Sequence, residues 1–268
     1  MSHLSHSPIF IGGVPRSGTT LLRVILDSHP QIFCGTELRV VHALANLWSA
    51  ATEHGQELLT RAYGADDQHV RDVFAELILS FLRPAWVASG KSRVAEKTPS
   101  NLLAFPALRS LFPDSPLVHV IRDVRDVVAS RLERDRAADP AADSNALAAL
   151  RAREWVQAMT IRSTMLTQAE LARRYFEVRY EDLVSSPETV LIPLFAFLGE
   201  SFDPVVLSFH RIERNVSGSE EWSAESVRRS IFTSSQGRWR RDLTPQEQQA
   251  VLDEAGAAMI ELGYDLKS

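Results

Sequence analysis

The sequence predicts an α/β fold in which a central parallel sheet carries helices on both faces. Short, apolar, β-branched segments alternate with longer amphipathic segments along the chain, and this alternation is typical of parallel sheets with helical crossovers. The apolar run 8–13 stops at two glycines, and the run 117–121 leads directly into charged residues. Because neither an internal repeat nor an interdomain linker interrupts the pattern, we expect one domain over residues 1–268.

Each predicted strand is an apolar run that stops at a glycine, a proline or charged residues. The expected strands are 8–13, 32–34, a short strand within 93–99 that ends in a loop before Pro99, 117–121 and 176–180. The helices are predicted from apolar residues at helical spacing, with prolines and capping residues as end signals. We expect helices around 21–26, at 37–51, two within 56–81 closed by Arg83-Pro84, and at 102–112, 122–134, 144–173 and 187–198.

The last helix is expected to begin at Thr244-Pro-Gln-Glu247, which has the cap, the proline and the glutamate of a helix start. Three segments lack periodicity. We expect residues 1–7 to be disordered, 135–143 to form an Ala/Asp-rich connector, and the serine- and arginine-rich stretch 212–242 to be irregular.

Composition excludes several classes of protein. The 268 residues carry 29 Lys+Arg against 34 Asp+Glu, so nucleic acid is not expected as a bulk electrostatic partner. The single cysteine, Cys34, rules out an intramolecular disulfide framework. The chain shows no signal peptide and no run of about 20 apolar residues that would span a bilayer. We therefore expect a cytoplasmic protein without a membrane partner.

The sharpest motif joins the first predicted strand to its helix and reads Gly12-Gly-Val-Pro-Arg-Ser-Gly-Thr-Thr20. Such a loop directs several backbone N–H groups towards one point at the positive end of a helix dipole, and so binds phosphate. Because it resembles the nucleotide loop G-x-x-x-x-G-K-[ST], we expect a P-loop-like fold. The alternative is a glycine-rich turn without a ligand, but a turn alone does not require Arg16 and its neighbouring hydroxyls.

A second phosphate site is predicted after the strand 117–121. Arg122 follows that strand directly, and Ser130 lies two helical turns later. A guanidinium and a hydroxyl in this arrangement hold one phosphate from two sides. Two phosphate sites at one edge of a parallel sheet suit a nucleotide with phosphate at both ends of its ribose. The alternative is a surface ladder of arginines and aspartates on the helix.

These residues carry a family resemblance. Pro15-Arg-Ser-Gly-Thr-Thr-Leu-Leu22 resembles the 5′-phosphosulfate loop of the sulfotransferases, which use 3′-phosphoadenosine-5′-phosphosulfate (PAPS) as donor. The continuation, Leu26-Asp-Ser-His-Pro30 and Cys34-Gly-Thr-Glu-Leu-Arg39, is most similar to the protein-tyrosine sulfotransferase branch and its bacterial relatives. The resemblance implies that an acceptor hydroxyl is sulfated, that adenosine 3′,5′-bisphosphate (PAP) is released, and that no metal is needed.

The resemblance also implies roles for single residues. The donor contacts that it implies are Arg16, Ser17, Gly18, Thr19, Thr20, Arg122, Ser130, Tyr180, Gly237 and Arg238. The catalytic residues that it implies are Glu37, Arg16, Lys97 and Ser223, and Arg39 is the implied substrate contact. Glu37 is the general base, because the acceptor oxygen must lose its proton as the S–O bond forms. Lys97 and Arg16 stabilise the charge on the oxygen that leaves.

Structural alternatives exist for the catalytic residues as well. A glutamate early in a helix is also a common surface residue matched to the helix dipole, and a loop lysine is often only solvated. Tyr180 also suits the core at the end of a strand, and Ser223 lies in a stretch where the resemblance is loose.

Two other functions compete with sulfuryl transfer. A P-loop nucleotide kinase would use the same strand, loop and helix, but Thr19 stands where the loop of such an enzyme has a lysine. A non-catalytic nucleotide-binding protein would need neither Glu37 nor Lys97. The acceptor is either a peptide tyrosine or a small phenol or alcohol, and a homodimer is one of the open oligomeric states.

Overall fold

The computed structural model describes residues 7–212 and 229–266, and its centre is one sheet of five strands in the order β2-β3-β1-β4-β5. The strands are β1 (Ile9–Gly13), β2 (Ile32–Cys34), β3 (Arg93–Lys97), β4 (Leu117–Ile121) and β5 (Tyr175–Arg179). Every pairing is parallel, with Ile11 of β1 opposite Lys97 of β3 and Val118 of β4. The α/β fold class and all five strands are confirmed, with β5 placed one residue earlier than predicted.

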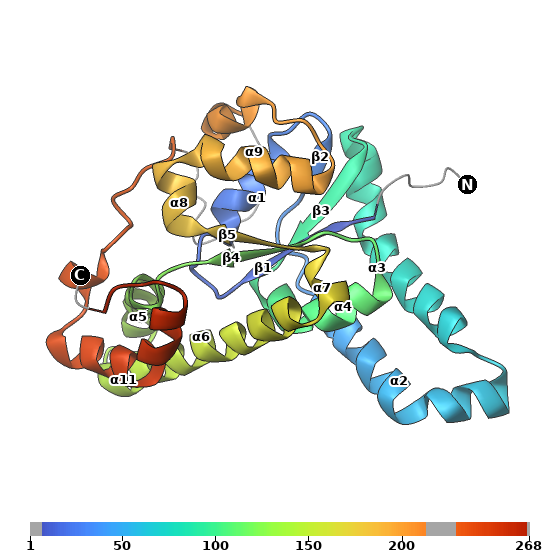
Figure 1. The fold of residues 1–268 in the computed structure, drawn as a ribbon, viewed down its shortest axis with the longest axis horizontal. Coiled ribbons are helices and arrows are strands. Elements are labelled where there is room, and N and C mark those ends of the chain that lie inside the picture. The colour runs from blue at the N-terminus through green and yellow to red at the C-terminus, as the bar shows by residue number, and fades with distance from the viewer. Residues whose placement is uncertain (1–6, 213–228, 267–268) are drawn as a thin grey trace.

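Helices cover both faces of this sheet (Figure 1). One face is covered by α1 (Thr19–Asp27), α8 (Tyr180–Ser185), α9 (Pro187–Leu198) and the 3₁₀ helix η2 (Pro204–Arg211). The other is covered by the 3₁₀ helix η1 (Pro99–Ala104), α4 (Phe105–Leu111), α5 (Val124–Ala138), α6 (Ser144–Thr167), α10 (Trp239–Asp242) and α11 (Pro245–Glu261). The short α7 (Ala169–Ala172) leads into β5.

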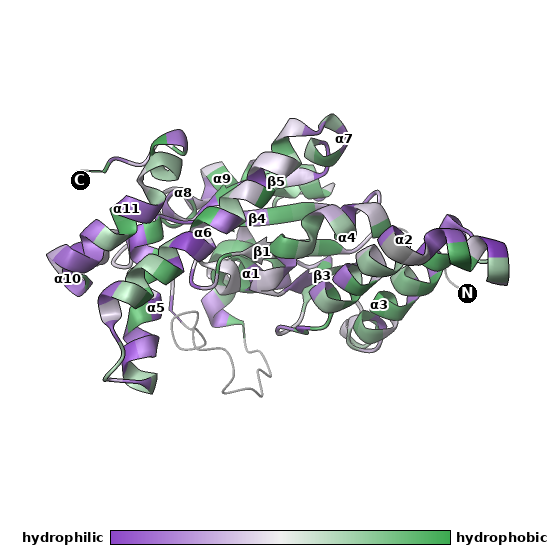
Figure 2. Ribbon diagram, turned by 90° about the horizontal axis from the view of Figure 1, so that it is seen from below, coloured by the Kyte–Doolittle hydropathy of each residue, from purple (hydrophilic) through white to green (hydrophobic). Residues whose placement is uncertain are grey.

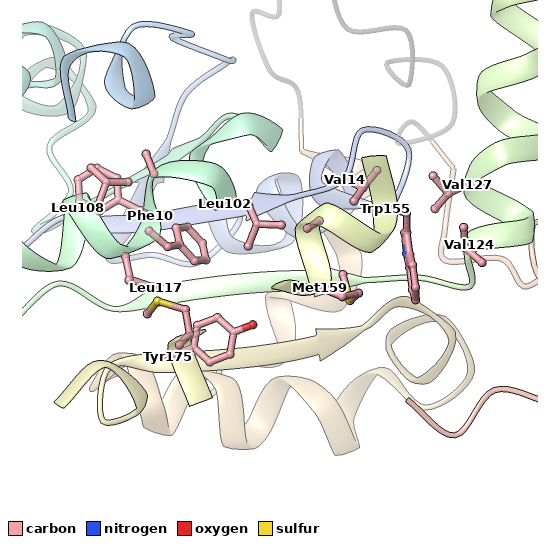
Figure 3. Packing of buried hydrophobic residues seen from close by; sticks show 14 of the residues in the cluster. Phe10, Val14, Leu102, Leu108, Leu117, Val124, Val127, Trp155, Met159 and Tyr175 are labelled. Atoms are coloured by element: carbon pink, nitrogen blue, oxygen red, sulfur yellow. The ribbon is translucent and has the colours of Figure 1, made fainter. Parts of the chain in front are cut away.

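The alternation of side chains along the strands divides the core in two. Ile9 and Ile11 pack on the α1 and α9 side, whereas Phe10 packs on the α4 and α6 side, where its ring centroid lies 5.3 Å from that of Phe112. All residues of β1, β3 and β4 are buried, and Figure 2 shows β1 and β4 as largely hydrophobic. Figure 3 shows Trp155 among these core residues, and its indole Nε1 donates to the carbonyl of Arg122 over 3.0 Å.

Two long helices correct the prediction for residues 37–89. Helix α2 (Val41–Tyr63) begins four residues later than expected, so Glu37 lies in the loop before it. Helix α3 (Asp67–Ser89) continues through Pro84 instead of ending there. Proline costs one helical hydrogen bond, but Pro84 is exposed, and buried Leu82 and Trp86 on either side of it hold the helix against the core.

Three further boundaries differ from the prediction. Helix α5 extends to Ala138, because Asp135 and Arg136 in its last turns pair with Arg151 and Glu247, so the connector shortens to 139–143. The helix expected over 144–173 divides into α6 and α7. Within 212–242, residues 239–242 form α10 rather than irregular chain.

Other predictions meet the structure in different ways. The start of α11 is confirmed, since the Thr244 side chain and the Glu247 backbone form the expected capping box. The prediction of disorder for 1–7 falls almost entirely outside the described residues, as does Ser223. In the ranges that the structure describes, no helix combines the length and the apolar character needed to cross a membrane.

Candidate active site

The carboxyl ends of all five strands meet at one edge of the sheet, and each end carries a predicted site residue. The loop 14–18 follows β1, Glu37 follows β2, and Lys97 is the last residue of β3. Arg122 follows β4, and Tyr180 follows β5. Ligands of open α/β sheets bind at this edge. The topology alone therefore brings together residues that are far apart in the chain.

The loop after β1 has a strained backbone. Arg16 has a φ of 80° and Gly18 has a φ of 101°. Positive φ values disfavour every residue that carries a Cβ atom. A Cβ atom on Gly18 would lie 2.4 Å from the ring of Tyr180, so the close approach of that ring also requires glycine. The Ser17 hydroxyl is buried without a hydrogen-bond partner, and no side chain caps the first turn of α1. The loop thus retains unused donors of the kind that bind an oxyanion.

Arginines gather around this loop. The Arg16 Nε donates to the Ser130 hydroxyl over 2.9 Å. Burial, followed by the positive charge of three neighbouring guanidiniums, lowers the pKa of Arg16 to about 10. The neighbours, in order of effect, are Arg134, Arg122 and Arg238. Such a cluster of like charges is unfavourable by itself and becomes favourable when an anion binds.

Arg122 joins the two predicted phosphate sites. Its Nη1 donates to the carbonyl of Arg16 over 3.1 Å, and its Nη2 donates to the carbonyl of Ser235. Its guanidinium carbon lies 4.4 Å from the centre of the Tyr180 ring, and its Nη2 lies 3.6 Å from the Asp126 carboxylate. Arg122, Ser130 and the loop after β1 are therefore in direct contact with one another.

The candidate catalytic residues lie at the ends of β2 and β3. The Lys97 Nζ is 2.7 Å from the Glu37 Oε1 and donates to the Thr20 hydroxyl over 3.2 Å. Lys97 is fully buried, whereas 21% of the Glu37 side chain is exposed. The Arg39 Nε lies 3.4 Å from the other carboxylate oxygen of Glu37. A carboxylate that reaches solvent, beside a buried cation and the phosphate-type loop, is suited to take up a proton from a bound ligand.

Glu96 positions this carboxylate, and the sequence reasoning did not identify it. Its buried Oε1 accepts hydrogen bonds from the backbone N–H of Leu38 over 3.2 Å and from the Thr98 hydroxyl over 2.7 Å. Thr98 in turn accepts from the backbone N–H of Arg39 over 3.2 Å. Burial raises the pKa of Glu96, and the bonds from Asn101, Thr98 and Leu38 oppose that rise. Residues 38–39 are thereby fixed to the end of β3.

Residues of both halves line one open cavity of about 400 Å³. The predicted site residues that line it are Arg16, Gly18, Thr19, Thr20, Glu37, Arg39, Arg122 and Tyr180. Part of the wall is polar, since His42 and Ser100 line the cavity and the His42 Nδ1 lies 3.1 Å from the Ser100 hydroxyl. Phe209, Ile231 and Phe232 form an apolar part of the wall. One cavity therefore combines an anion site with a pocket that has a polar and an apolar side.

Residues 237–239 contact the site through Asp126. The carboxylate of Asp126 accepts from the backbone N–H groups of Gly237 over 2.9 Å and Trp239 over 3.1 Å. The Arg238 side chain pairs with Asp242 over 2.6 Å and with Glu133 over 2.9 Å. Gly237 and Arg238 thus lie next to the arginine cluster but do not line the cavity.

Several residues near the site were missed by the sequence reasoning, and four of them are polar or charged groups that contact predicted site residues or line the cavity with them. They are His42, Glu96, Asp126 and Arg134. Arg134 carried a usable signal, because it lies one helical turn after Ser130 on α5 and so shares its face. Among residues 7–212 and 229–266, no group of three or more His, Cys, Asp or Glu is arranged to hold a metal ion.

The glycine-containing loop between β1 and α1, with its arginines, places the chain among α/β proteins that have a P-loop-like anion site. Residues 8–204 match the profile described as the sulfotransferase family, and the chain belongs to that family. A putative protein-tyrosine sulfotransferase of Caenorhabditis briggsae is 29% identical and covers 97% of this chain and 90% of its own length. Protein-tyrosine sulfotransferase 1 of Danio rerio is 30% identical, with coverages of 96% and 72%.

Solved structures share the fold. The sulfotransferase domain of the Synechococcus PCC 7002 olefin synthase gives a TM-score of 0.66 at 21% identity and covers 99% of this chain and 98% of its own. Mouse sulfotransferase SULT7A1, solved in complex with PAP, gives 0.62 at 15% identity, with coverages of 97% and 88%. The predicted family and the P-loop-like fold are confirmed.

Proposed function

We propose that this protein transfers a sulfuryl group from PAPS to the hydroxyl of an aryl or alkyl acceptor. The observation that carries the proposal is the contact between Glu37 and Lys97 over 2.7 Å, beside Thr20 of the phosphate-type loop. A protein that only binds nucleotides has no need of a solvent-accessible carboxylate paired with a fully buried lysine at this place.

The donor suits the residues that are present. The buried Ser17 hydroxyl lacks a partner, and the pKa of Arg16 is lowered by burial and by three like charges. Both features are relieved by an oxyanion. Residues 16–20 would hold the 5′ end of the nucleotide, and Arg122 with Ser130 would hold its 3′-phosphate, with Tyr180, Gly237 and Arg238 nearby. When bound, the donor supplies the sulfuryl group and a phosphate as leaving group.

The chain's own residues then handle protons and charge. Glu37 takes the proton from the acceptor hydroxyl and transfers it to solvent through its exposed side. Lys97 places a buried positive charge next to Thr20, where negative charge develops during transfer. Arg16, held against Ser130, adds a cation that lines the cavity itself.

The lining of the cavity that contains Glu37 supports a class of acceptor. An apolar side formed by Phe209, Ile231 and Phe232 suits the ring of a phenol, and the side with His42 and Ser100 suits polar substituents. Arg39, whose side chain is 59% exposed, is placed to attract an acidic group that flanks the hydroxyl. The relatives named protein-tyrosine sulfotransferase support a peptide tyrosine as one acceptor, with small phenols and alcohols as the other.

The proposed base is tested by Glu37→Gln, which keeps the shape of the side chain and removes its basicity. We expect turnover with radiolabelled donor and a phenol or tyrosine peptide to fall about 10²–10⁴-fold, while PAP affinity changes little. Glu57→Gln is the matched control, since Glu57 is an exposed glutamate that pairs with Arg61 on α2.

Because Gln leaves buried Lys97 without its carboxylate, thermal unfolding of the variant must be measured alongside turnover. Near-normal turnover by a folded Glu37→Gln protein would show that Glu37 is not the base. The cytoplasmic location and the single domain over 1–268 stay predictions of the sequence.

A further inference from the structure

Glu181 lies in the first turn of α8, directly after Tyr180, and contacts three other segments of the chain. Its Oε1 accepts from the backbone N–H of Asp123 over 2.9 Å, and its Oε2 accepts from the Tyr264 hydroxyl over 3.2 Å. Its backbone carbonyl accepts from the Gln236 side chain over 2.8 Å. Neither Glu181 nor Tyr264 lines the cavity, so these contacts act on the site from outside it.

The contact with Asp123 fixes the backbone next to Arg122. The N–H of Asp123 belongs to the peptide group that joins it to Arg122, and the carbonyl of the same peptide group accepts from the Trp155 indole over 3.0 Å. Both polar ends of this group are therefore bound, one by Glu181 of α8 and the other by Trp155 of α6. The backbone from which the Arg122 side chain extends is thereby held from two sides.

Arg122 needs this support because its guanidinium lies among like charges. Burial, and then the charges of Arg134, Arg122 and Arg238, lower the pKa of Arg16, so these guanidiniums repel one another until an anion binds. Repulsion alone would separate Arg122 from Arg16, yet the Arg122 Nη1 donates to the Arg16 carbonyl over 3.1 Å. A site whose groups are already in place avoids the cost of ordering them when the ligand binds.

Glu181 is also connected to the groups that surround the Arg122 guanidinium. The ring of Tyr180, one residue before Glu181, has its centre 4.4 Å from the guanidinium carbon. The Arg122 Nη2 donates to the carbonyl of Ser235, and the next residue, Gln236, is the one that donates to the Glu181 carbonyl. Glu181 is thus linked to the backbone of Arg122 and to two of the groups that contact its side chain.

Tyr264 holds the Glu181 carboxylate in place. Its side chain is buried, and the guanidinium carbon of Arg179 lies 3.9 Å from the centre of its ring. The Arg179 Nη1 also donates to the carbonyl of Leu262 over 2.9 Å, and its Nε lies 3.7 Å from the Glu181 Oε2. Residues 262–264 are thereby connected to the end of β5 and, through Glu181, to Arg122.

We infer that Glu181 is a positioning residue of the nucleotide site: it fixes the peptide group next to Arg122, and Tyr264 fixes its carboxylate. The inference rests on the proposed function, because Arg122 is the proposed contact of the 3′-phosphate. Loss of this support displaces Arg122 and weakens binding of the nucleotide. Glu37 and Lys97 follow β2 and β3 in the other half of the site, so transfer from fully bound donor keeps its rate.

The test measures PAP affinity by calorimetry and initial rates with PAPS on the full chain. Glu181→Ala removes the acceptor of a buried N–H, so the Kd of PAP and the KM for PAPS should rise about 10- to 100-fold. The kcat at saturating donor and the KM for the acceptor should change less than about twofold. Glu181→Gln retains a side-chain oxygen for the Asp123 N–H and should recover most of the affinity. Glu188→Ala, which removes an exposed glutamate at the start of α9, is the matched control.

Tyr264→Phe removes one hydroxyl and tests the coupling of the two residues. PAP affinity should fall about 3- to 10-fold when the substitution is made in the wild type. It should fall less than about 1.5-fold in the Glu181→Ala background, because the hydroxyl acts through Glu181. Tyr63→Phe, at an exposed tyrosine of α2, should have no effect. Because Tyr264→Phe is a small change, it should fold even where Glu181→Ala does not.

The outcomes separate this inference from the proposed function. A wild type that binds no PAP refutes the proposed donor and this inference with it. Normal binding by the wild type, with unchanged affinity in Glu181→Ala and Tyr264→Phe, refutes the positioning role alone. A loss of kcat as large as the rise in KM, or additive effects of the two substitutions, would show that the residues only stabilise the fold.

Discussion

Arg16 combines two features that each cost stability. Its φ of 80° is rare for a residue with a Cβ atom, and its guanidinium lies among those of Arg134, Arg122 and Arg238. Neither feature contributes to packing. A backbone strain and a like-charge cluster that occur together at the end of a strand are typical of a ligand site, since only the bound anion offsets their cost.

Replacing Arg16 with Gln should therefore stabilise the ligand-free protein and weaken PAP binding. The folded-state pKa of Arg16 is about 10, below its value in the unfolded chain, so at neutral pH the folded state holds a charge that it disfavours. We expect the free energy of unfolding to rise by about 1 kcal/mol when this charge is removed. The gain is smaller than the full pKa shift implies, because solvent screens part of the charge. Urea unfolding and PAP titration measure the two effects.

The same linkage gives a sign to the pH dependence of the wild type. The destabilisation by Arg16 is complete below its folded pKa of about 10 and is relieved as the pH rises from there towards the higher pKa of the unfolded chain. Arg61→Gln, which removes an exposed arginine paired with Glu57, is the control. A less stable Arg16→Gln protein would contradict the account of the cluster.

Strand β4 contains a polar residue in an otherwise apolar, fully buried run. The His119 Nδ1 lies 2.6 Å from the Tyr175 hydroxyl of β5. Strand β4 and the edge strand β5 are therefore joined by a side-chain contact as well as by their backbone hydrogen bonds. Burial, with a smaller effect from the charge of Arg162, lowers the pKa of His119 to about 3. The ring is therefore neutral in the folded protein.

Buried His119 should make the free energy of unfolding fall in acid. The stabilising contribution of neutral His119 is complete above the unfolded pKa of 6.5 and is lost as the pH falls towards 3. The free energy of unfolding should drop by about 1.4 kcal/mol per pH unit in that window. His119→Gln should remove this slope in urea unfolding, whereas exposed His69→Gln should keep it. Equal slopes in both variants would refute the assignment.

Elements were predictable where their signals are local. Pro187 at the start of α9 and the Thr244–Glu247 capping box of α11 act within one turn, and both helices begin where expected. The start of α2 and the continuation of α3 through Pro84 were not predictable from local signals. The backbone N–H groups of Leu38 and Arg39 bond to Glu96 and Thr98, which lie 58 and 59 residues away in the chain, and these bonds keep the two residues out of the helix.

At the scale of the molecule, the five parallel strands deliver the two halves of the site to one edge. The anion half is built after β1, β4 and β5, and the carboxylate half after β2 and β3. Central strand β1 lies between β3 and β4, so its loop touches both halves, through Thr20 to Lys97 and through Arg16 to Ser130. A ligand that spans the cavity therefore couples elements from both ends of the sheet.

PAP should consequently stabilise the whole fold. At about 100 times its Kd it should add about 2.7 kcal/mol to the free energy of unfolding. ATP should add much less, because Thr19 occupies the position of the lysine that contacts the terminal phosphates in kinases. Thermal shift with PAP, ATP and ATP plus magnesium measures this. A larger shift with magnesium-ATP would favour the kinase alternative, and equal shifts without turnover would favour a non-catalytic binding protein.

The sequence by itself determined which segments form the strands along the chain, the phosphate-type loop and the residues at the strand ends, because these depend on periodicity and on motifs a few residues long. Only the tertiary structure decided that Glu96 and Asp126 hold the site loops, that Arg134 joins the arginine cluster, and that Arg238 pairs with Asp242 and Glu133. Most of these contacts join residues that are far apart in the chain. Their partners are chosen by strand order and helix packing, which no local pattern encodes.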